Sequence, residues 1–306
     1  PAAPVKNGFT FDGWYVNGKK WNFNDRITDS IVLTAVYRSN DFDNATAEVL
    51  PVKGGAGGIV SIIHDDGRSA TGYILDSMFY EYGLVGDVAM LTRFIYNAST
   101  ATTNAEYNRW KTIIDTGRWG VISHSMTHTW WGTVTKDENG NNIAWEQDDD
   151  KMYDEIVVSQ QILRNLFPGQ RVLTFAYPGF ADEKKSLTGA QQLEIIYSEA
   201  ARALIEEYYI SGRKSYEATP AYVTEEAYWA FLDAFFLTPS NINGTGDNSL
   251  LNRLESAAND GRIQLISMHA VSKDVTPGTW DGNTLSSVDV DKAMQLIASY
   301  VDSGKV

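Results

Sequence analysis

The chain of 306 residues contains no cysteine. This absence excludes disulfide bonds, a zinc site made of thiolates and a cysteine nucleophile, so any metal ion has to be held by His, Asp or Glu side chains. The chain also lacks an apolar run that approaches the roughly 18 residues needed to cross a bilayer. The sequence therefore predicts no membrane span.

Basic residues are scarce as well: 25 Lys and Arg stand against 39 Asp and Glu, which leaves a formal net charge of −14. A surface that binds nucleic acid needs an excess of cations to displace counterions, so we expect no nucleic-acid partner. Hydrophobic residues make up 43% of the chain and aromatic residues 12%, which is enough for a packed core. The composition is that of a globular protein, and a neutral partner is expected.

The first 38 residues have the pattern of a small β-rich module. Residues 10–16 and 31–37 have the composition of strands, and Asn17-Gly18 between them is a strong signal for a hairpin turn. We assign Trp14 and Trp21 to the core of this module. The alternative is an N-terminal hairpin that belongs to the main domain.

The same segment resembles the internalin B-repeat family of bacterial surface proteins. The resemblance rests on residues spread along the segment: Pro4, Lys6, Gly8-Phe9-Thr10-Phe11, Gly13-Trp14-Tyr15, Trp21, Phe23, Leu33-Thr34-Ala35 and Tyr37. It implies a β-grasp-like spacer and an extracellular or bacterial cell-surface location, and it says nothing about chemistry.

A second domain is expected to follow a linker. The stretch after residue 38 is polar and acidic, and it ends among the glycines of 54–58. Such composition is typical of flexible connections, so we place the linker at 39–55 and the second domain at 56–306. The oligomeric state is left open.

Apolar strands alternate with helices in the second domain. Strands are expected at 59–63, 120–123, 171–176 and 263–268, and helices at 87–94, 105–115, 150–166, 191–207, 222–234 and 249–259. The alternation predicts α/β architecture, and a barrel whose site lies at the C-terminal ends of its strands. Residues 133–150 are interpreted as a solvated loop, with a calcium site as the alternative, and residues 182–186 as a loop.

Ligand-type side chains gather at the ends of these strands. The four histidines, which are His64, His124, His128 and His269, all lie at or just beyond a predicted strand end. On one helical turn, His124 and His128 would lie about 5–6 Å apart on the same face, which suits one cation. Two His and one carboxylate form a recurrent divalent-metal set with open positions, and Asp65-Asp66 supplies the carboxylate. The alternative is a pair of polar residues that cap a helix.

From about Gly58 to the C-terminus, the sequence resembles the polysaccharide deacetylase family, carbohydrate esterase family four. Four motifs appear in the family's order: Asp65-Asp66-Gly67, His124-Ser125-x-x-His128, Ala176-Tyr177-Pro178-Gly179 and Ser267-Met268-His269. The resemblance implies a distorted (β/α) barrel and a metal-dependent hydrolase acting on an acetylated polysaccharide. The acetyl group could be N-linked, as in chitin-like or cell-wall glycans, or O-linked, as in xylan.

The resemblance also implies a role for each motif. Asp65 would be the general base and His269 the general acid, and the backbone N–H of Gly179 would bind the oxyanion. One divalent ion would be held by Asp66, His124 and His128. Zinc is the expected metal, with cobalt or nickel as alternatives, because a His₂Asp site accepts all three.

Two positions depart from the family pattern. His64 stands where the family more often has an apolar or aromatic residue; it is either a side chain packed behind the site or a lesser ligand or substrate contact. Ala176 replaces the arginine that orients the base carboxylate, and Arg213 is our candidate to replace that arginine. The missing arginine leaves a second hypothesis open, a catalytically inactive, carbohydrate-binding relative on a surface protein.

Several side chains near the motifs are candidates for substrate binding. Trp130 and Trp131 follow the second metal-binding histidine, and Trp280 follows His269 in a loop rich in Gly and Thr. Exposed aromatic rings of this kind could stack on sugars, although a tryptophan is more often part of a core. Tyr177 and Pro178 of the third motif are included among the substrate-binding candidates.

Overall fold

The computed structural model describes residues 2–6, 9–16, 19–23, 31–39, 56–140, 142–179, 195–214, 221–222 and 232–306. The chain divides into two compact units, Pro1–Leu50 and Pro51–Val306, and each is described by itself. The predicted turn at Asn17-Gly18, nearly all of the 39–55 linker and the 182–186 loop lie outside the described residues. The proposed domain boundaries remain predictions.

The N-terminal unit contains a three-stranded antiparallel sheet in the order β2-β1-β3. Its strands are β1 (Phe9–Val16), β2 (Lys19–Lys20) and β3 (Thr34–Ser39). Phe11 packs edge-on against Trp14 and Tyr37, with ring centroids 5.6 and 5.7 Å apart. The predicted strand at 10–16 is confirmed, whereas the one predicted at 31–37 begins three residues later. The resemblance to internalin repeats stays a prediction.

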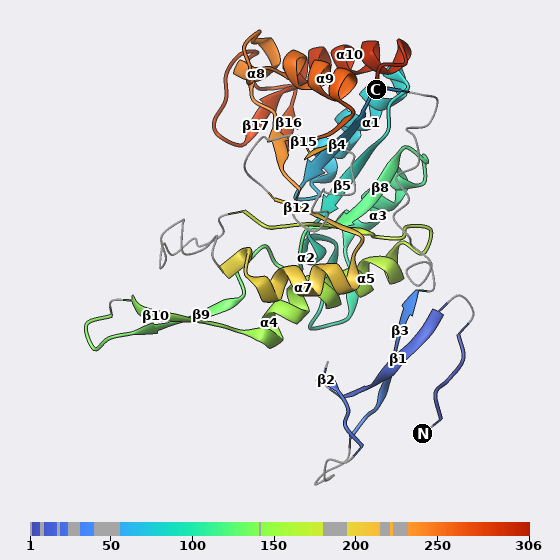
Figure 1. Ribbon diagram of the computed structural model, residues 1–306, viewed down its shortest axis with the longest axis vertical. Coiled ribbons are helices and arrows are strands. Elements are labelled where there is room, and N and C mark those ends of the chain that lie inside the picture. Colours follow the sequence, from blue (N-terminus) through green and yellow to red (C-terminus); the bar gives the residue numbers. More distant parts are fainter. Residues whose placement is uncertain are drawn as a thin grey trace. The chain divides into compact units, whose positions relative to one another are not determined.

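The second unit is built on seven parallel strands that form a nearly closed barrel (Figure 1). Around the barrel they run β12 (Ser211–Arg213), β11 (Thr174–Ala176), β8 (Trp119–Ser123), β5 (Gly86–Met90), β4 (Ile59–Asp65), β15 (Arg262–Met268) and β14 (Ala234–Phe236). Leu232, just before β14, bridges the gap to β12, because its N–H donates to the carbonyl of Gly212 and its own carbonyl accepts from Lys214. The predicted (β/α) barrel is confirmed.

The two faces of the barrel strands pack differently. The outer face contacts the helices, with Ile62, Val88 and Ile266 in one core with Leu75 and Phe79 of α1 (Ser69–Tyr82). A separate cluster takes its side chains from the strands and their ends, and it fills the interior: Ile63, Ala89, Ile122, Ala176, Leu232, Ala234, Ile263 and Leu265. Small and large residues share this interior, as in packed barrel cores.

Strand register decides which polar side chains enter the barrel interior. Asp65 pairs with Ala89, and Arg213 pairs with Ala176, and both alanines belong to the interior cluster. Paired residues on neighbouring strands face the same side of a sheet. Asp65 and Arg213 therefore both point inward, whereas the neighbour of Asp65, His64, points outward.

Helices connect the strands and cover the barrel. They are α2 (Thr92–Ile95), α3 (Ala105–Ile114), α4 (Asp149–Tyr153), a π-helical turn (Asp154–Val158), α5 (Ser159–Leu166), α7 (Glu199–Tyr208), α8 (Pro239–Asn243), α9 (Leu250–Asp260) and α10 (Ser287–Asp302). Asn104 and Ser249 cap α3 and α9 by accepting backbone N–H groups. The helices predicted at 105–115, 150–166 and 249–259 are confirmed. Within the described ranges, no helix combines the length and hydropathy that crossing a membrane requires.

Two secondary-structure predictions are wrong, and a third is contradicted at its described ends. The helix predicted at 87–94 is β5 followed by α2; residues 88–90 are completely buried in a central strand, and that burial overrides the helix preference of Ala and Met. Of the helix predicted at 222–234, residues 223–231 lie outside the described residues; its two described ends belong to strands, since Tyr222 is part of β13 (Ala221–Tyr222) and Ala234 of β14. The loop predicted at 133–150 contains the antiparallel pair β9 (Gly132–Lys136) and β10 (Asn142–Gln147).

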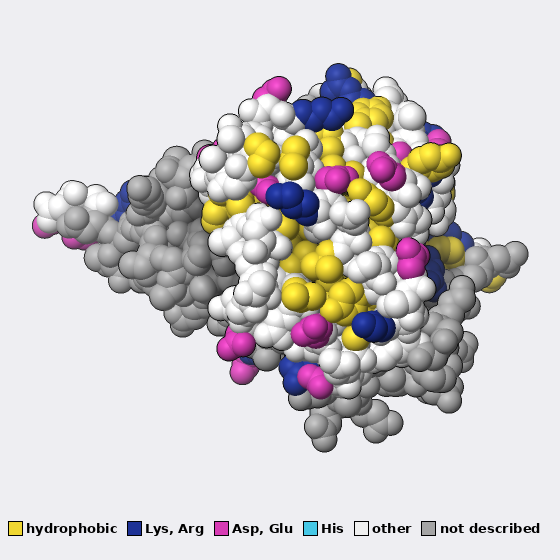
Figure 2. Space-filling model, turned by 90° about the horizontal axis from the view of Figure 1, so that it is seen from above, with side chains coloured by type: hydrophobic (Ala, Val, Ile, Leu, Met, Phe, Trp, Pro, Cys, Tyr) yellow, Lys and Arg dark blue, Asp and Glu magenta, His cyan; other side chains and the backbone are white. Residues whose placement is uncertain are grey.

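Two further pairs of short strands flank the barrel. They are β6 (Tyr96–Asn97) with β7 (Thr102–Thr103), and β16 (Ala270–Ser272) with β17 (Thr284–Ser286). The face in Figure 2 carries charges of both signs among hydrophobic side chains, and no histidine of the described residues shows on it. His64 and His124 are buried.

Candidate metal centre

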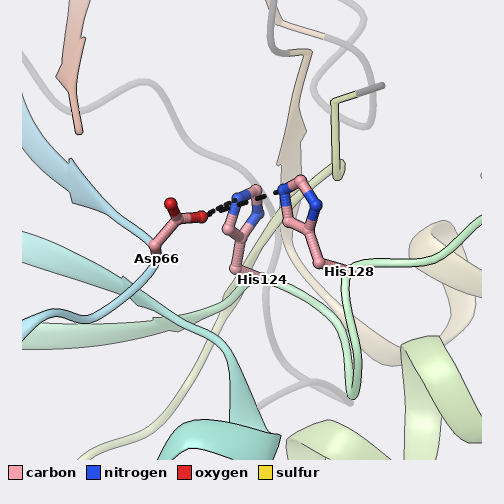
Figure 3. A group of neighbouring side chains, drawn as sticks. All are labelled: Asp66, His124 and His128. Carbon is pink, nitrogen blue, oxygen red and sulfur yellow. Dashed lines mark ion pairs between the residues drawn. The ribbon is translucent and has the colours of Figure 1, made fainter. Parts of the chain in front are cut away.

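Three ligand-type side chains meet at the C-terminal ends of β4 and β8 (Figure 3). Oδ1 of Asp66 lies 3.7 Å from Nε2 of His124 and 3.8 Å from Nε2 of His128. The ligand atoms of all three residues lie within 4.8 Å of one another. Two imidazole nitrogens and one carboxylate oxygen at this spacing suit a divalent cation with open coordination positions.

Hydrogen bonding fixes how His124 presents its ring. Its Nδ1 lies 2.9 Å from the carbonyl oxygen of Ala176. Because a carbonyl only accepts, Nδ1 carries the proton, and the lone pair of Nε2 faces Asp66. A metal-binding histidine commonly has its other nitrogen held in this way.

Burial keeps both imidazoles in the neutral form that binds metal. It lowers the pKa of His124 well below the usual value, and the charges of His128 and Arg213 add to the effect. Burial also lowers the pKa of His128, while Asp66 opposes the shift. Neutral imidazoles bind a cation without first losing a proton.

The backbone of the site is strained at three residues. Asp66, Ser125 and His128 have φ values of 72°, 70° and 63°, in the left-handed region. Each such residue costs on the order of 1–3 kcal/mol and persists only where its surroundings hold it. One hydrogen bond that holds this conformation runs from the N–H of His128 to Oγ of Ser125, over 3.0 Å.

The conformation of this segment corrects one prediction. Residues 124–131 form no helix, so His124 and His128 are not placed by a helical turn. Instead the two left-handed residues fold the chain back, and the imidazole centroids lie 4.8 Å apart at 75°.

A buried ion pair lies next to the ligand group. Nη2 of Arg213 donates to Oδ1 of Asp65, and both side chains are almost completely buried. Burial raises the pKa of the Asp65 carboxyl, and the charges of Arg213 and His269 oppose the rise. The arginine that we selected as the replacement for the third-motif arginine thus contacts the candidate base.

We expect Arg213→Lys to lower turnover about tenfold or more, because an ammonium is a point charge and cannot hold a carboxylate in one orientation as a guanidinium does. Metal content should not change, since the hydrogen bonds of Arg213 among the described residues go to Asp65 and to the carbonyl of Lys214, and Lys keeps the positive charge. Acetate release and metal analysis on the same preparation measure both quantities. Arg118→Lys, at the two-bond pair with Asp76, is the matched control. Wild-type turnover in Arg213→Lys would contradict the orienting role.

His269 follows β15 at the same end of the barrel. Its charge acts on Asp65, His124 and His128. Its ring packs against Phe236, with centroids 4.8 Å apart, and Nδ1 is buried without a hydrogen-bond partner among the described residues. The candidate acid, the candidate base and the ligand group therefore share one end of the barrel.

His64 belongs to the opposite face of β4. It is 1% exposed, and its ring stacks on that of Trp110 with centroids 5.9 Å apart. Burial lowers its pKa to about 4, so the imidazole is neutral at neutral pH. The ligand group found among the described residues does not include His64, which leaves the interpretation of a side chain packed behind the site.

The substrate-binding candidates divide by exposure. Trp280 is 43% exposed and its ring lies 6.2 Å from that of Phe236, whereas Trp130 is half-buried with the ammonium of Lys151 5.2 Å from its ring. Trp131 is completely buried, and its Nε1 donates to the carbonyl of Ile195. A ring without exposed surface cannot stack on a sugar, so the prediction for Trp131 is corrected: it is a core residue.

The third motif begins at Ala176, the last residue of β11, and continues into the segment that follows. Tyr177 is completely buried beside Phe175, so the prediction that its side chain binds substrate is corrected in the same way. The backbone N–H of Tyr177 donates to the carbonyl of Arg213, which ties the motif to β12. Pro178 is buried and Gly179 half-buried. The oxyanion role of Gly179 stays a prediction.

Sequence reasoning missed Glu155. It is 3% exposed in the π-helical turn, and its carboxylate accepts hydrogen bonds from the backbone and hydroxyl of Thr127 and from the hydroxyl of Thr129. These threonines flank His128. A carboxylate directly before the apolar run Ile156-Val157-Val158 was the available signal.

We expect Glu155→Gln to weaken metal binding about tenfold, because an amide cannot accept all three hydrogen bonds and the loop around His128 loses its anchor. Glu207→Gln, an exposed change on α7, serves as the control. Zinc titration of both variants decides the matter. An unchanged affinity in Glu155→Gln would mean that the loop is held by other contacts.

The sequence matches no family model and no curated protein. Among solved structures, the chain is similar to a family 4 carbohydrate esterase from Streptomyces lividans in complex with acetate, at 15% identity over 81% of this chain and 91% of that one, with a TM-score of 0.44. It is also similar to the Xyl-CE4 domain of a multidomain xylanase from the hindgut metagenome of Trinervitermes trinervoides, at 16% identity, 81% and 84% coverage and a TM-score of 0.42. A CE4 family pseudoenzyme from Bacillus anthracis is similar at 12% identity, 83% and 63% coverage and a TM-score of 0.44. At these scores the likenesses assign neither an activity nor any residue's role to this chain.

Proposed function

We propose that this chain is a metal-dependent hydrolase. The observation that carries the proposal is the Asp66–His124–His128 group beside the buried Asp65–Arg213 pair. A three-ligand site with open positions next to an oriented carboxylate is the arrangement that hydrolysis with an activated water requires.

More particularly, we propose that it removes acetyl groups from an acetylated polysaccharide at an extracellular or cell-surface location. The four motifs in family order support this substrate class. The ring of Phe236 also supports it, because it contacts both the ring of His269 and the ring of the exposed Trp280. A sugar could stack on Trp280 next to the candidate acid.

The donor set fits a divalent cation. Nε2 of His124 offers a lone pair because Nδ1 is held by Ala176, and the carboxylate of Asp66 supplies the third ligand. Zinc is the proposed ion, with cobalt and nickel as alternatives. When bound, such an ion polarises a carbonyl and lowers the pKa of a coordinated water.

The chain's own groups supply the proton transfers. Arg213 engages Oδ1 of Asp65, which leaves Oδ2 to accept the proton of the attacking water. Burial raises the pKa of Asp65 and so strengthens it as a base, while the charge of Arg213 opposes the rise. His269 donates a proton to the leaving amine or alcohol, and the N–H of Gly179 donates to the developing oxyanion.

Acetate release from a panel of N-acetylated chitin-like and O-acetylated xylan oligosaccharides tests the proposal. The chain stripped with a chelator should be inactive, and one equivalent of zinc should restore activity on at least one substrate. The panel also distinguishes N- from O-acetyl substrates. A chain that binds zinc but releases no acetate from any member would overturn the deacetylase assignment.

The second candidate function is a catalytically inactive, carbohydrate-binding relative. Ala176 at the position of the family's arginine favours it. The contact of Arg213 with Asp65 weakens this argument, because a guanidinium reaches the candidate base from β12 instead. Oligosaccharide binding by calorimetry, without acetate release, would favour the inactive relative.

A further inference from the structure

The turn after β4 carries one of the candidate metal ligands. Asp66 and Gly67 have φ values of 72° and 69°, so two consecutive residues are left-handed. The direction of the Asp66 carboxylate depends on this turn. A Cβ added at Gly67 would lie 2.6 Å from Sδ of Met90, which shows how closely the turn packs on the end of β5.

Two buried rings hold the carbonyls of this turn. Nε1 of Trp110 donates to the carbonyl of Gly67 over 2.6 Å. Nε2 of His64 lies 3.2 Å from the carbonyl of Arg68, and because a carbonyl only accepts, Nε2 carries the proton. The two rings are stacked at 26° and neither has more than 1% of its surface exposed.

Helices α1 and α3 pack closely around the indole of Trp110 and hold the end of the turn. Gly72 of α1 lies so close to the indole that an added Cβ would be 2.7 Å from it. One turn before Trp110 on α3, the carboxylate of Glu106 accepts the N–H of Ser69 over 3.4 Å. The backbone of residues 67–69 therefore forms three hydrogen bonds to side chains outside the turn. The partners are Trp110, His64 and Glu106, in chain order of the turn residues.

We propose that His64 and Trp110 are positioning residues that hold the left-handed turn and thereby aim the Asp66 carboxylate at His124 and His128. The inference rests on the proposed metal-dependent function. Neither ring belongs to the ligand group, so each acts through the turn. Partners that orient a ligand typically change metal affinity by about 10- to 100-fold when they are removed.

Zinc affinity of the full chain, measured without substrate by competition with a chromophoric chelator, tests the proposal. Trp110→Phe removes the N–H donor and keeps an aromatic ring, and it should bind zinc about 10- to 100-fold more weakly. His64→Leu should weaken binding in the same way. His64→Gln retains an N–H donor at a similar reach and should bind more tightly than His64→Leu.

Trp119→Phe is the matched control. Trp119 is 3% exposed, its ring lies 5.4 Å from that of Trp110, and its Nε1 donates to Asp76 rather than to the turn. It should lower the melting temperature about as much as Trp110→Phe but leave zinc affinity unchanged.

Each outcome decides between explanations. Equal zinc affinities of the wild type and Trp110→Phe would overturn the role of Trp110, and equal affinities of His64→Gln and His64→Leu would overturn that of His64. If Trp110→Phe does not fold, the two His64 variants still decide. Absence of zinc binding by the wild-type chain would instead overturn the proposed function, and this inference with it.

Discussion

Asp65→Asn should lower the turnover for acetate release by about 100-fold or more, because an amide cannot take the proton of the attacking water. Metal content should stay at one equivalent, since the ligand group consists of Asp66, His124 and His128. Steady-state rates and metal analysis on one preparation measure both. Near-normal acetate release would remove Asp65 from the mechanism.

The same change also affects stability, because Asp65 pairs with a completely buried arginine. Removing one partner of a buried ion pair lowers the free energy of unfolding by about 3–5 kcal/mol. The variant therefore has to be shown to be folded before its turnover is interpreted. Asp65→Glu keeps a carboxylate for Arg213 but displaces it by one methylene, and we expect it to fold and to lose turnover.

Asp87→Asn is the matched control for Asp65→Asn. Asp87 lies on the neighbouring strand β5, paired with Ile63, and its carboxylate is 3.5 Å from the hydroxyl of Ser61. Burial raises its pKa. Asn keeps the size of Asp87 and an oxygen that can accept the hydroxyl of Ser61, so turnover should stay within about twofold of wild type.

His128→Ala should weaken binding of the divalent ion by at least about 100-fold, because only two of the three protein ligands remain. The side chain of His128 is 19% exposed, so its removal opens space to solvent rather than a sealed cavity, and the fold should survive. Metal content after dialysis and a zinc titration measure the loss.

His269→Ala separates metal binding from proton transfer. His269 lies at the same end of the barrel, but it is not part of the ligand group. We expect this variant to keep a full equivalent of metal and to lose turnover, whereas His128→Ala should lose both. A full equivalent retained by His128→Ala would show that the ligand assignment is incorrect.

The barrel could be predicted from the sequence to the extent that its strands are long and buried on both faces. The apolar runs at 59–63, 120–123 and 263–268 correspond to β4, β8 and β15. β12 and β14 have three residues each, which is too short to show a pattern. β5 contains Asp87, Ala89 and Met90, whose local preference is not for a strand, and only its central place in the sheet makes it one.

The ligand group could be predicted because its signal is local. Asp66 comes directly after an apolar strand, and His124 directly after another, and parallel strands place their C-terminal ends at one edge. The conformation that joins His124 to His128 was not predictable in the same way. Groups outside the segment also hold it: the N–H of Thr92 donates to the carbonyl of Ser125, and Glu155 accepts the N–H of Thr127. No helical spacing rule describes such contacts, or the left-handed backbone at Ser125 and His128.

By itself the sequence determined the α/β class, the strand ends at which the site lies and the residue types that could hold a cation. Only the tertiary structure decided which distant groups meet. The sequence offered Arg213 as a candidate partner of Asp65, and only the structure shows that these residues, 148 positions apart, pair across the barrel. It also shows that Glu155 reaches Thr127 from a helix and that Trp131 is buried rather than exposed. The physical reason is that the periodicity of a sequence shows only which face of an element is apolar. Contacts between elements depend on strand register and side-chain packing, and these are determined by all elements of the folded chain at once.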